Sequence, residues 1–134
     1  MEARRDETFE LRAAEDIVRV RQLARTWAVS IGFSLVDQTK IVTAASELAR
    51  NTIDYGGGGS VRMRWLVNGA RAGLRMDFVD SGPGIANLEL AMRDGYTTGS
   101  GLGLGLSGTR RLMSDFEIES TPGKGTRVSV ARWK

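Results

Sequence analysis

The sequence lacks two residue types altogether, since none of its 134 residues is a cysteine or a histidine. Without cysteine the chain has no disulfides and no thiol nucleophile, and without histidine it has no imidazole base; zinc sites need one or both. Any chemistry must therefore use carboxylates, amides, hydroxyls, the backbone and a hard metal ion. That inventory suits magnesium and phosphate.

Long apolar runs are also missing. Nowhere do eighteen apolar residues follow one another, and residues 1–6 open without an apolar segment, so we expect no membrane association and a cytoplasmic location. The net charge is only +3, and the arginines are dispersed rather than clustered with aromatics, so we expect no nucleic-acid partner. The length predicts one domain, residues 1–134, with a single core.

The N-terminal third shows a change of hydrophobic period. Residues 8–13 alternate, with Phe9 and Leu11 on one side, which predicts an edge strand. From about Asp16 the period becomes helical until Gly32 ends it, and the apolar stripe of this helix includes Trp27, which we expect in the core rather than stacked on a ligand.

A second helix is expected to begin after the N-cap Ser34, with Asp37 as its capping-box acid, and to run to Tyr55. Glu47 and Asn51 lie one turn apart on the flank of its apolar arc. They are candidate functional residues at the border of the core. The alternative is an ordinary solvated glutamate followed by an asparagine.

Four glycines, 56–59, are expected to form a flexible connection before a half-buried strand over residues 61–67. Asn68-Gly69 predicts the turn of a hairpin, with the partner strand running antiparallel from Arg71. The period of two then places Asp80 on the inward face, where a carboxylate is costly unless hydrogen-bonded. The alternative is a turn aspartate, for which Asp-Ser-Gly is well suited.

The C-terminal part predicts a short helix over residues 88–93, a lid segment before residue 99, a helix over 106–114 and a second hairpin formed by 116–120 and 126–133. Thr126 shares the inward face with Val128, near Asp80 if the strands are neighbours. Lys124 lies between strands and is therefore not a P-loop lysine.

Glycine is concentrated in residues 80–84 and 99–105. Uncovered amide groups followed by the start of a helix favour a phosphate chain, so we interpret this stretch as a nucleotide site. A mobile surface loop is the alternative.

The motifs ELARN (47–51), DSGPG (80–84), GSGLGLG (99–105) and Gly125-Thr126 resemble, in order and spacing, the boxes of the GHKL ATPase/kinase superfamily. Residues 46–51 and 105–113 are most similar to the RsbT-type switch serine/threonine kinases of bacterial stress signalling, although anti-sigma-factor kinases share the boxes. The resemblance implies an α/β Bergerat fold, a two-layer sandwich with a mixed, mainly antiparallel sheet and helices on one face.

The resemblance also implies ATP and magnesium as cofactors. Asp80 would accept a hydrogen bond from the adenine amino group, Gly84 would let the base approach, Asn51 would coordinate magnesium and Glu47 would be the catalytic base. The residues expected to bind nucleotide are Asn51, Asp80, Gly82, Gly84, Gly99, Gly101, Leu102, Gly103, Leu104, Gly105 and Thr126.

The partner implied by the resemblance is a STAS-domain antagonist phosphorylated on serine or threonine, within a stressosome-like complex or upstream of a phosphatase. The alternative function is a factor that sequesters a sigma factor under nucleotide control. A third alternative, an ATPase module of a larger clamp machine, needs further domains. A histidine-kinase domain acting alone is disfavoured because the chain contains no phosphoacceptor histidine.

Overall fold

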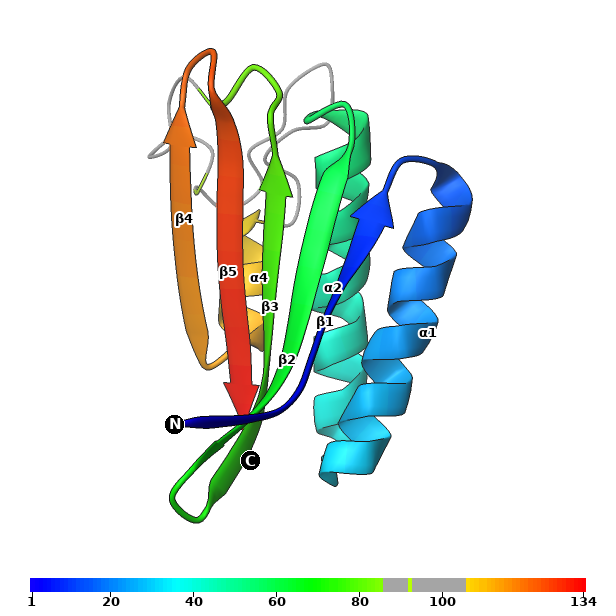
Figure 1. Ribbon diagram of the computed structural model, residues 1–134, viewed down its shortest axis with the longest axis vertical. Helices are drawn as coiled ribbons and strands as arrows, with labels where there is room; N and C mark the ends of the chain where they lie inside the picture. Colours follow the sequence, from blue (N-terminus) through cyan, green and yellow to red (C-terminus); the bar gives the residue numbers. More distant parts are fainter. Residues whose placement is uncertain (86–91, 93–105) are drawn as a thin grey trace.

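The computed structural model describes residues 1–85, 92 and 106–134. These residues form a single sheet with helices layered against it, as Figure 1 shows. The elements in chain order are β1 (Glu2–Leu11), α1 (Ala14–Ile31), α2 (Leu35–Asp54), β2 (Gly59–Asn68), β3 (Arg71–Asp80), α4 (Leu106–Leu112), β4 (Asp115–Thr121) and β5 (Gly125–Trp133).

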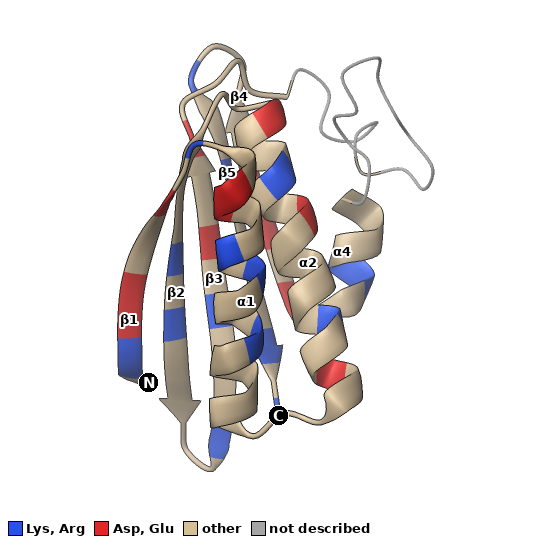
Figure 2. Ribbon diagram, turned by 90° about the vertical axis from the view of Figure 1, so that its right-hand side faces the viewer, with Lys and Arg blue, Asp and Glu red and all other residues tan. Residues whose placement is uncertain are grey.

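The sheet has five strands in the order β1-β2-β3-β5-β4. All four pairings are antiparallel, so among the described residues the sheet is antiparallel throughout rather than mixed as expected. The helices cover one face of it, in the α/β two-layer arrangement that the family resemblance implies (Figures 1 and 2). In the helical layer α2 contacts both α1 and α4.

Strand β1 is an edge strand, as predicted, but it begins at Glu2 and ends at Leu11 rather than spanning 8–13. Hydrophobic alternation does not predict the first part of this strand, because residues 2–7 contain almost no apolar side chain. Arg5 makes the contact that an apolar side chain would otherwise make, since its guanidinium lies 4.6 Å from the ring centre of Trp27. A register shift between Ala3 and Arg5 further breaks the alternation.

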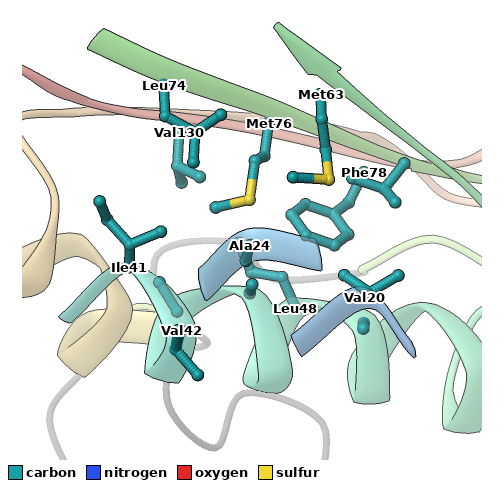
Figure 3. Close-up of a cluster of buried hydrophobic side chains, with 14 of the residues drawn as sticks. Val20, Ala24, Ile41, Val42, Leu48, Met63, Leu74, Met76, Phe78 and Val130 are labelled. Carbon is teal, nitrogen blue, oxygen red and sulfur yellow. The ribbon is translucent and has the colours of Figure 1, made fainter. Parts of the chain in front are cut away.

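The core lies between the helices and the inward face of the sheet (Figure 3). Met63, Met76 and Phe78 point from β2 and β3 toward Ala24 of α1 and Leu48 of α2. All of these side chains are buried. Trp27 is also buried, with 1% of its surface exposed, which confirms its expected place in the core.

The start of α2 agrees with the predicted cap. The Ser34 hydroxyl accepts a hydrogen bond from the Asp37 backbone N–H at 3.2 Å. The carboxylate of Asp37, expected to complete a capping box, instead accepts from Nη2 of Arg132 at 2.9 Å. The N-terminal end of α2 is thereby tied to β5.

The two hairpins form as predicted, with one correction in the first. Asn68 pairs with Arg71, so the turn residues are Gly69 and Ala70 rather than Asn68 and Gly69. Only Gly69 has a positive φ, 62°, and Asn68 continues the strand. A turn with positive φ at its first position alone explains the shift by one residue, since glycine satisfies it unaided.

Further boundaries differ slightly. Gly59 already belongs to β2, so the expected flexible connection is shorter than 56–59, and α4 ends at Leu112 rather than at residue 114. The predicted short helix over 88–93 and the lid segment before residue 99 lie outside the described residues.

The outer face of the sheet carries a charge cluster around Asp77. Its Oδ2 accepts from Nη2 of Arg64 at 2.7 Å, and Arg75 and Arg127 approach Oδ1 at 3.5 and 3.9 Å. Burial opposes ionisation of this carboxyl, but the neighbouring Ser129 hydroxyl and the arginines outweigh that effect, so the pKa of Asp77 lies below its ordinary value.

No helix in the described part of the chain combines the length and apolarity that a membrane span needs.

Candidate functional site

A cavity lies where α2 meets the ends of β3 and β5. Its walls come from α2, α4, all three C-terminal strands and the chain after β3, and they are formed by Leu48, Asn51, Thr52, Tyr55, Phe78, Asp80, Ile85, Leu106, Ile118, Thr126 and Val128. Its volume is about 20 Å³, room for about one water molecule. A purine base would therefore enter only if residues of the cavity wall moved outward.

Asp80 lines this cavity from the end of β3, on the inward face that the alternation predicted. Its Oδ1 accepts a hydrogen bond from the Gly82 N–H at 2.9 Å. Asp80 therefore does have the turn role considered as an alternative, and that role uses one of its two carboxylate oxygens. The other oxygen, Oδ2, lies beside Gly56, where any side chain would overlap it.

Thr126 pairs directly with Asp80 across β3 and β5, which confirms that the two are neighbours. Its hydroxyl lies 2.8 Å from the hydroxyl of Ser120 on β4. Ser120 also accepts from the Ile85 N–H at 2.7 Å and lies 3.2 Å from the Gly125 carbonyl oxygen. Ser120 thus fixes the position of Thr126 and of the chain that leaves Asp80.

Glu47 and Asn51 lie one turn apart on α2 and open to different sides. Asn51 lines the cavity, and its Nδ2 is buried without a hydrogen-bond partner among the described residues. An unsatisfied buried amide is costly, so a ligand that met it would be stabilised. Glu47 instead lines a groove between α2 and α4, with 31% of its side chain exposed and Oε1 3.0 Å from Nη1 of Arg50.

The nucleotide-binding residues expected in the two glycine-rich stretches divide into two groups. Gly82 and Gly84 are described, whereas Gly99, Gly101, Leu102, Gly103, Leu104 and Gly105 lie outside the described residues. Gly84 has a φ of 75°, and a β-carbon there would overlap the Thr121 carbonyl of the β4–β5 turn. The structure thus gives a packing reason for this glycine beside its expected role at the base.

The donor set suits a magnesium ion held mainly by a nucleotide. Among the residues that the structure describes, no three acidic side chains gather at a point that could hold a metal ion. Asn51 lines the cavity and carries one amide oxygen, and magnesium commonly takes one or two protein ligands together with phosphate oxygens and water.

Comparison with known proteins assigns the family. Residues 36–134 match the model of the histidine kinase-, DNA gyrase B- and HSP90-like ATPases. The chain belongs to this family. The matched region begins at the first turn of α2 and contains every element that lines the cavity.

Two curated relatives are similar over most of the chain. The serine/threonine-protein kinase RsbT of Bacillus subtilis is 43% identical over 118 residues, which cover 88% of this chain and 89% of that protein. The anti-sigma F factor of Thermoanaerobacter sp. is 29% identical over 84% of this chain and 82% of its own length. The sequence is thus more similar to the named kinase than to this anti-sigma factor.

Solved structures support the fold. The chain superposes on the RsbU and RsbW domains of a Mycobacterium tuberculosis protein with a TM-score of 0.65 and 19% identity, over 96% of this chain and 32% of that one. The catalytic domain of histidine kinase ThkA gives a TM-score of 0.55 and 21% identity, covering 96% and 98%. At these identities the likeness concerns the fold alone.

Sequence reasoning missed two residues of the site, Ser120 and Gly56. Ser120 follows Phe116 and Ile118 at every second position, and this spacing is a signal that could place its hydroxyl on their face of the strand. Nothing in the sequence shows that Gly56 packs against Asp80, because that contact joins segments that are distant along the chain.

Proposed function

We propose that this protein is an ATP- and magnesium-dependent serine/threonine protein kinase of the cytoplasm, which phosphorylates a STAS-domain antagonist in bacterial stress or sigma-factor regulation. Its similarity to the kinase RsbT over most of both chains supports this proposal. The observation that carries it is the placement of Asn51 and Glu47 on adjacent sides of one helix, the first in the cavity wall and the second in an open groove.

In this proposal the cavity binds the nucleotide. Asp80 keeps Oδ1 on the Gly82 N–H and offers Oδ2 to the adenine amino group. The hydroxyl of Thr126, held by Ser120, lies beside it as a second polar group for the base. Asn51, whose amide nitrogen has no partner among the described residues, would supply its amide oxygen to the metal.

When bound, magnesium would neutralise charge on the nucleotide phosphates. The residues of the chain position the acceptor hydroxyl and accept its proton. Because α2 places Glu47 one turn from Asn51, a hydroxyl in the groove reaches Glu47 while the terminal phosphate lies near Asn51. Glu47 accepts the hydroxyl proton, the oxygen forms a bond to the γ-phosphorus, and the bond to the β–γ bridging oxygen breaks to release ADP.

A second candidate function is sequestration of a sigma factor under nucleotide control, which similarity to proteins named anti-sigma F factor favours. The two functions differ in what happens to the partner. A kinase modifies it covalently and lets it go, whereas a sequestering factor retains it.

The test is incubation with γ-labelled ATP, magnesium and candidate STAS-domain proteins. We expect label on a serine or threonine of one of them, and no label when magnesium is chelated. Transfer to no STAS-domain protein, together with a stable complex with a sigma factor, would favour the sequestering function instead.

A further inference from the structure

Gly108 is the third residue of α4, and no contact among the described residues requires a glycine there. The helix spans only Leu106–Leu112, and glycine in a helix interior is unfavourable by comparison with alanine or leucine. A β-carbon at position 108 would meet no atom of the described residues within 4 Å. Packing among those residues therefore does not require a glycine, and its bare backbone remains available to something outside them.

What Gly108 faces is the groove that contains Glu47. This groove has a volume of about 330 Å³ and is lined by Thr43, Glu47, Gly108, Thr109 and Leu112. Its walls are thus the facing sides of α2 and α4, which lie next to each other in Figure 2. It is far larger than the cavity at Asp80, and Glu47 lies in its wall.

One face of α2 continues the groove away from Glu47. Val36, Lys40, Thr43 and Glu47 are spaced by four, three and four residues, which places them along one line of the helix. The line is about 16 Å long, at 1.5 Å per residue. At its far end Leu35 and Val36 are 70% and 64% exposed, an unusual degree for two adjacent large apolar side chains.

The charges along this face of α2 are mixed: Lys40 and Arg50 are basic, whereas Glu47, which pairs with Arg50, and the exposed Asp54 one turn further on are acidic. The basic excess comes from Lys40 at the apolar end and from Arg110 and Arg111, which are exposed on α4. Figure 2 shows blue segments on α4 and both blue and red segments on α2. A partner with carboxylates beside an apolar side chain would complement this surface.

We propose that the α2–α4 groove and the line from Val36 to Glu47 form the docking surface for the phosphoacceptor protein. The acceptor places an apolar side chain on Leu35 and Val36, a carboxylate near Lys40, and the backbone around its hydroxyl-bearing residue against Gly108. The absent side chain at position 108 lets that backbone come close enough for the hydroxyl to reach Glu47. This inference rests on the proposed kinase function and names the surface that would select the substrate.

Gly108→Leu gives the sharpest test, because it fills the groove without a clash among the described residues and improves helix propensity. We expect a melting temperature that is unchanged or higher and an ATP affinity within about twofold of the unsubstituted chain. Binding of the acceptor should weaken at least about tenfold. Gly108→Ala, which adds only one carbon, is the graded control and should have a smaller effect.

Val36→Asp tests the apolar end, and Val18→Asp is its matched control. Val18 is also an exposed valine of a helix, but it belongs to α1, on the other side of α2 from α4. Val36→Asp should weaken acceptor binding at least about tenfold and Val18→Asp should not. Lys40→Glu should reduce both the affinity and its dependence on salt.

Binding is measured by calorimetry with candidate STAS-domain proteins and a non-hydrolysable ATP analogue, whether or not phosphoryl transfer occurs. If no phosphoryl transfer occurs, the kinase proposal fails, but docking of the acceptor protein can still be measured. Unchanged acceptor binding in Gly108→Leu and Val36→Asp, or binding of no STAS-domain protein at all, overturns the docking surface. A loss of ATP affinity in Gly108→Leu also overturns the docking surface, because it would assign the groove to the nucleotide. A loss of self-association in the same variant overturns it too, because it would assign the groove to a second copy of the chain.

Discussion

Gly56 packs directly against the carboxylate of Asp80, and a β-carbon at position 56 would overlap Cγ and Oδ2 of that side chain. Gly82 in turn packs against the backbone of Gly56. The end of α2 and the turn after β3 therefore meet with no space between them. The glycine at 56 allows Asp80 to keep the orientation that it has in the wall of the cavity.

Gly56→Ala should displace Asp80 and lower ATP affinity by at least about tenfold, or 1.4 kcal/mol. Gly57→Ala is the control, because Gly57 has a φ of 75° but no described atom within 4 Å of its β-carbon position. That substitution should cost about 1 kcal/mol of folding stability through backbone strain and leave ATP affinity unchanged. Equal ATP affinities in the two variants, measured by calorimetry, would contradict the steric argument.

Asp80→Asn should separate the two roles of this side chain. An asparagine oxygen can still accept from the Gly82 N–H, so the turn and the melting temperature should be preserved. The second oxygen of the carboxylate is replaced by an amide donor, which should weaken ATP binding by roughly 2–3 kcal/mol, a factor of about 30 to 150. GTP should bind poorly to the unsubstituted protein because its keto oxygen would face a carboxylate. Unchanged ATP affinity would leave Asp80 with the turn role alone.

Asn51→Ala should abolish phosphoryl transfer while the helix survives. The change removes an amide whose nitrogen is buried without a partner among the described residues, so folding should lose little. Asn51→Asp retains an oxygen ligand and should keep part of the magnesium-dependent ATP binding. Circular dichroism checks the fold, and ATP titrations with and without magnesium check the role. Full activity in Asn51→Ala would show that this amide does not serve the metal.

Asp77 should make folding stability depend on pH. Its pKa is lowered in the folded state, so it stabilises the fold above about pH 4, the ordinary value of an unfolded aspartate, and this contribution is lost as the pH falls through the lower folded pKa. Urea unfolding between about pH 2 and 6 should show the loss. Asp77→Asn should be less stable at pH 7, because Arg64 and Arg75 lose a buried counter-charge, and should show a shallower acid slope.

Asp6 and Asp16 also have lowered pKa values and keep part of the acid slope in that variant. Glu117→Gln is the control, since Glu117 is an exposed carboxylate on the same face, 3.8 Å from Arg75. It should leave the slope nearly unchanged. An acid slope in Asp77→Asn as steep as in the unsubstituted protein would mean that other carboxyl groups carry it.

The sequence predicted most of the architecture because its signals are local. Helical spacing, Ser34 and Gly32 delimited the helices, and strict alternation placed Asp80 and Thr126 on the inward face. That the two are neighbours depended on the pairing of β3 with β5. Strand β1 shows where local signals end, since its first residues are charged and Arg5 is ordered by a contact with Trp27 from another element. The approach of Gly56 to Asp80 is equally non-local.

The groove could not be predicted for the same reason. Thr43, Glu47 and Gly108 are separated by up to 65 positions and become neighbours only when α4 packs against α2. Sequence spacing placed Glu47 relative to Asn51 but could not show that the two side chains open to different spaces. That division matters for function, because a base must reach the acceptor and not the nucleotide.

Glu47→Gln tests that division directly. Glu47 lines the groove and is not among the residues of the cavity, so the substitution should leave ATP affinity within about threefold, under 1 kcal/mol. Loss of the general base should lower phosphoryl transfer by about 10² to 10⁴. Glutamine keeps the length of the side chain and loses only an exposed ion pair with Arg50, so stability should change by less than about 0.5 kcal/mol.

Arg50→Gln is the matched control, because it removes the same ion pair while retaining the Glu47 carboxylate. If the pair itself were needed, both variants would lose transfer equally; if Glu47 is the base, only Glu47→Gln should fall by two orders of magnitude or more. The measurement is single-turnover transfer to a STAS-domain protein alongside equilibrium ATP binding. An unchanged transfer rate in Glu47→Gln would remove this residue as the base, whereas a protein that only sequesters its partner would hold that partner equally well with either side chain at position 47.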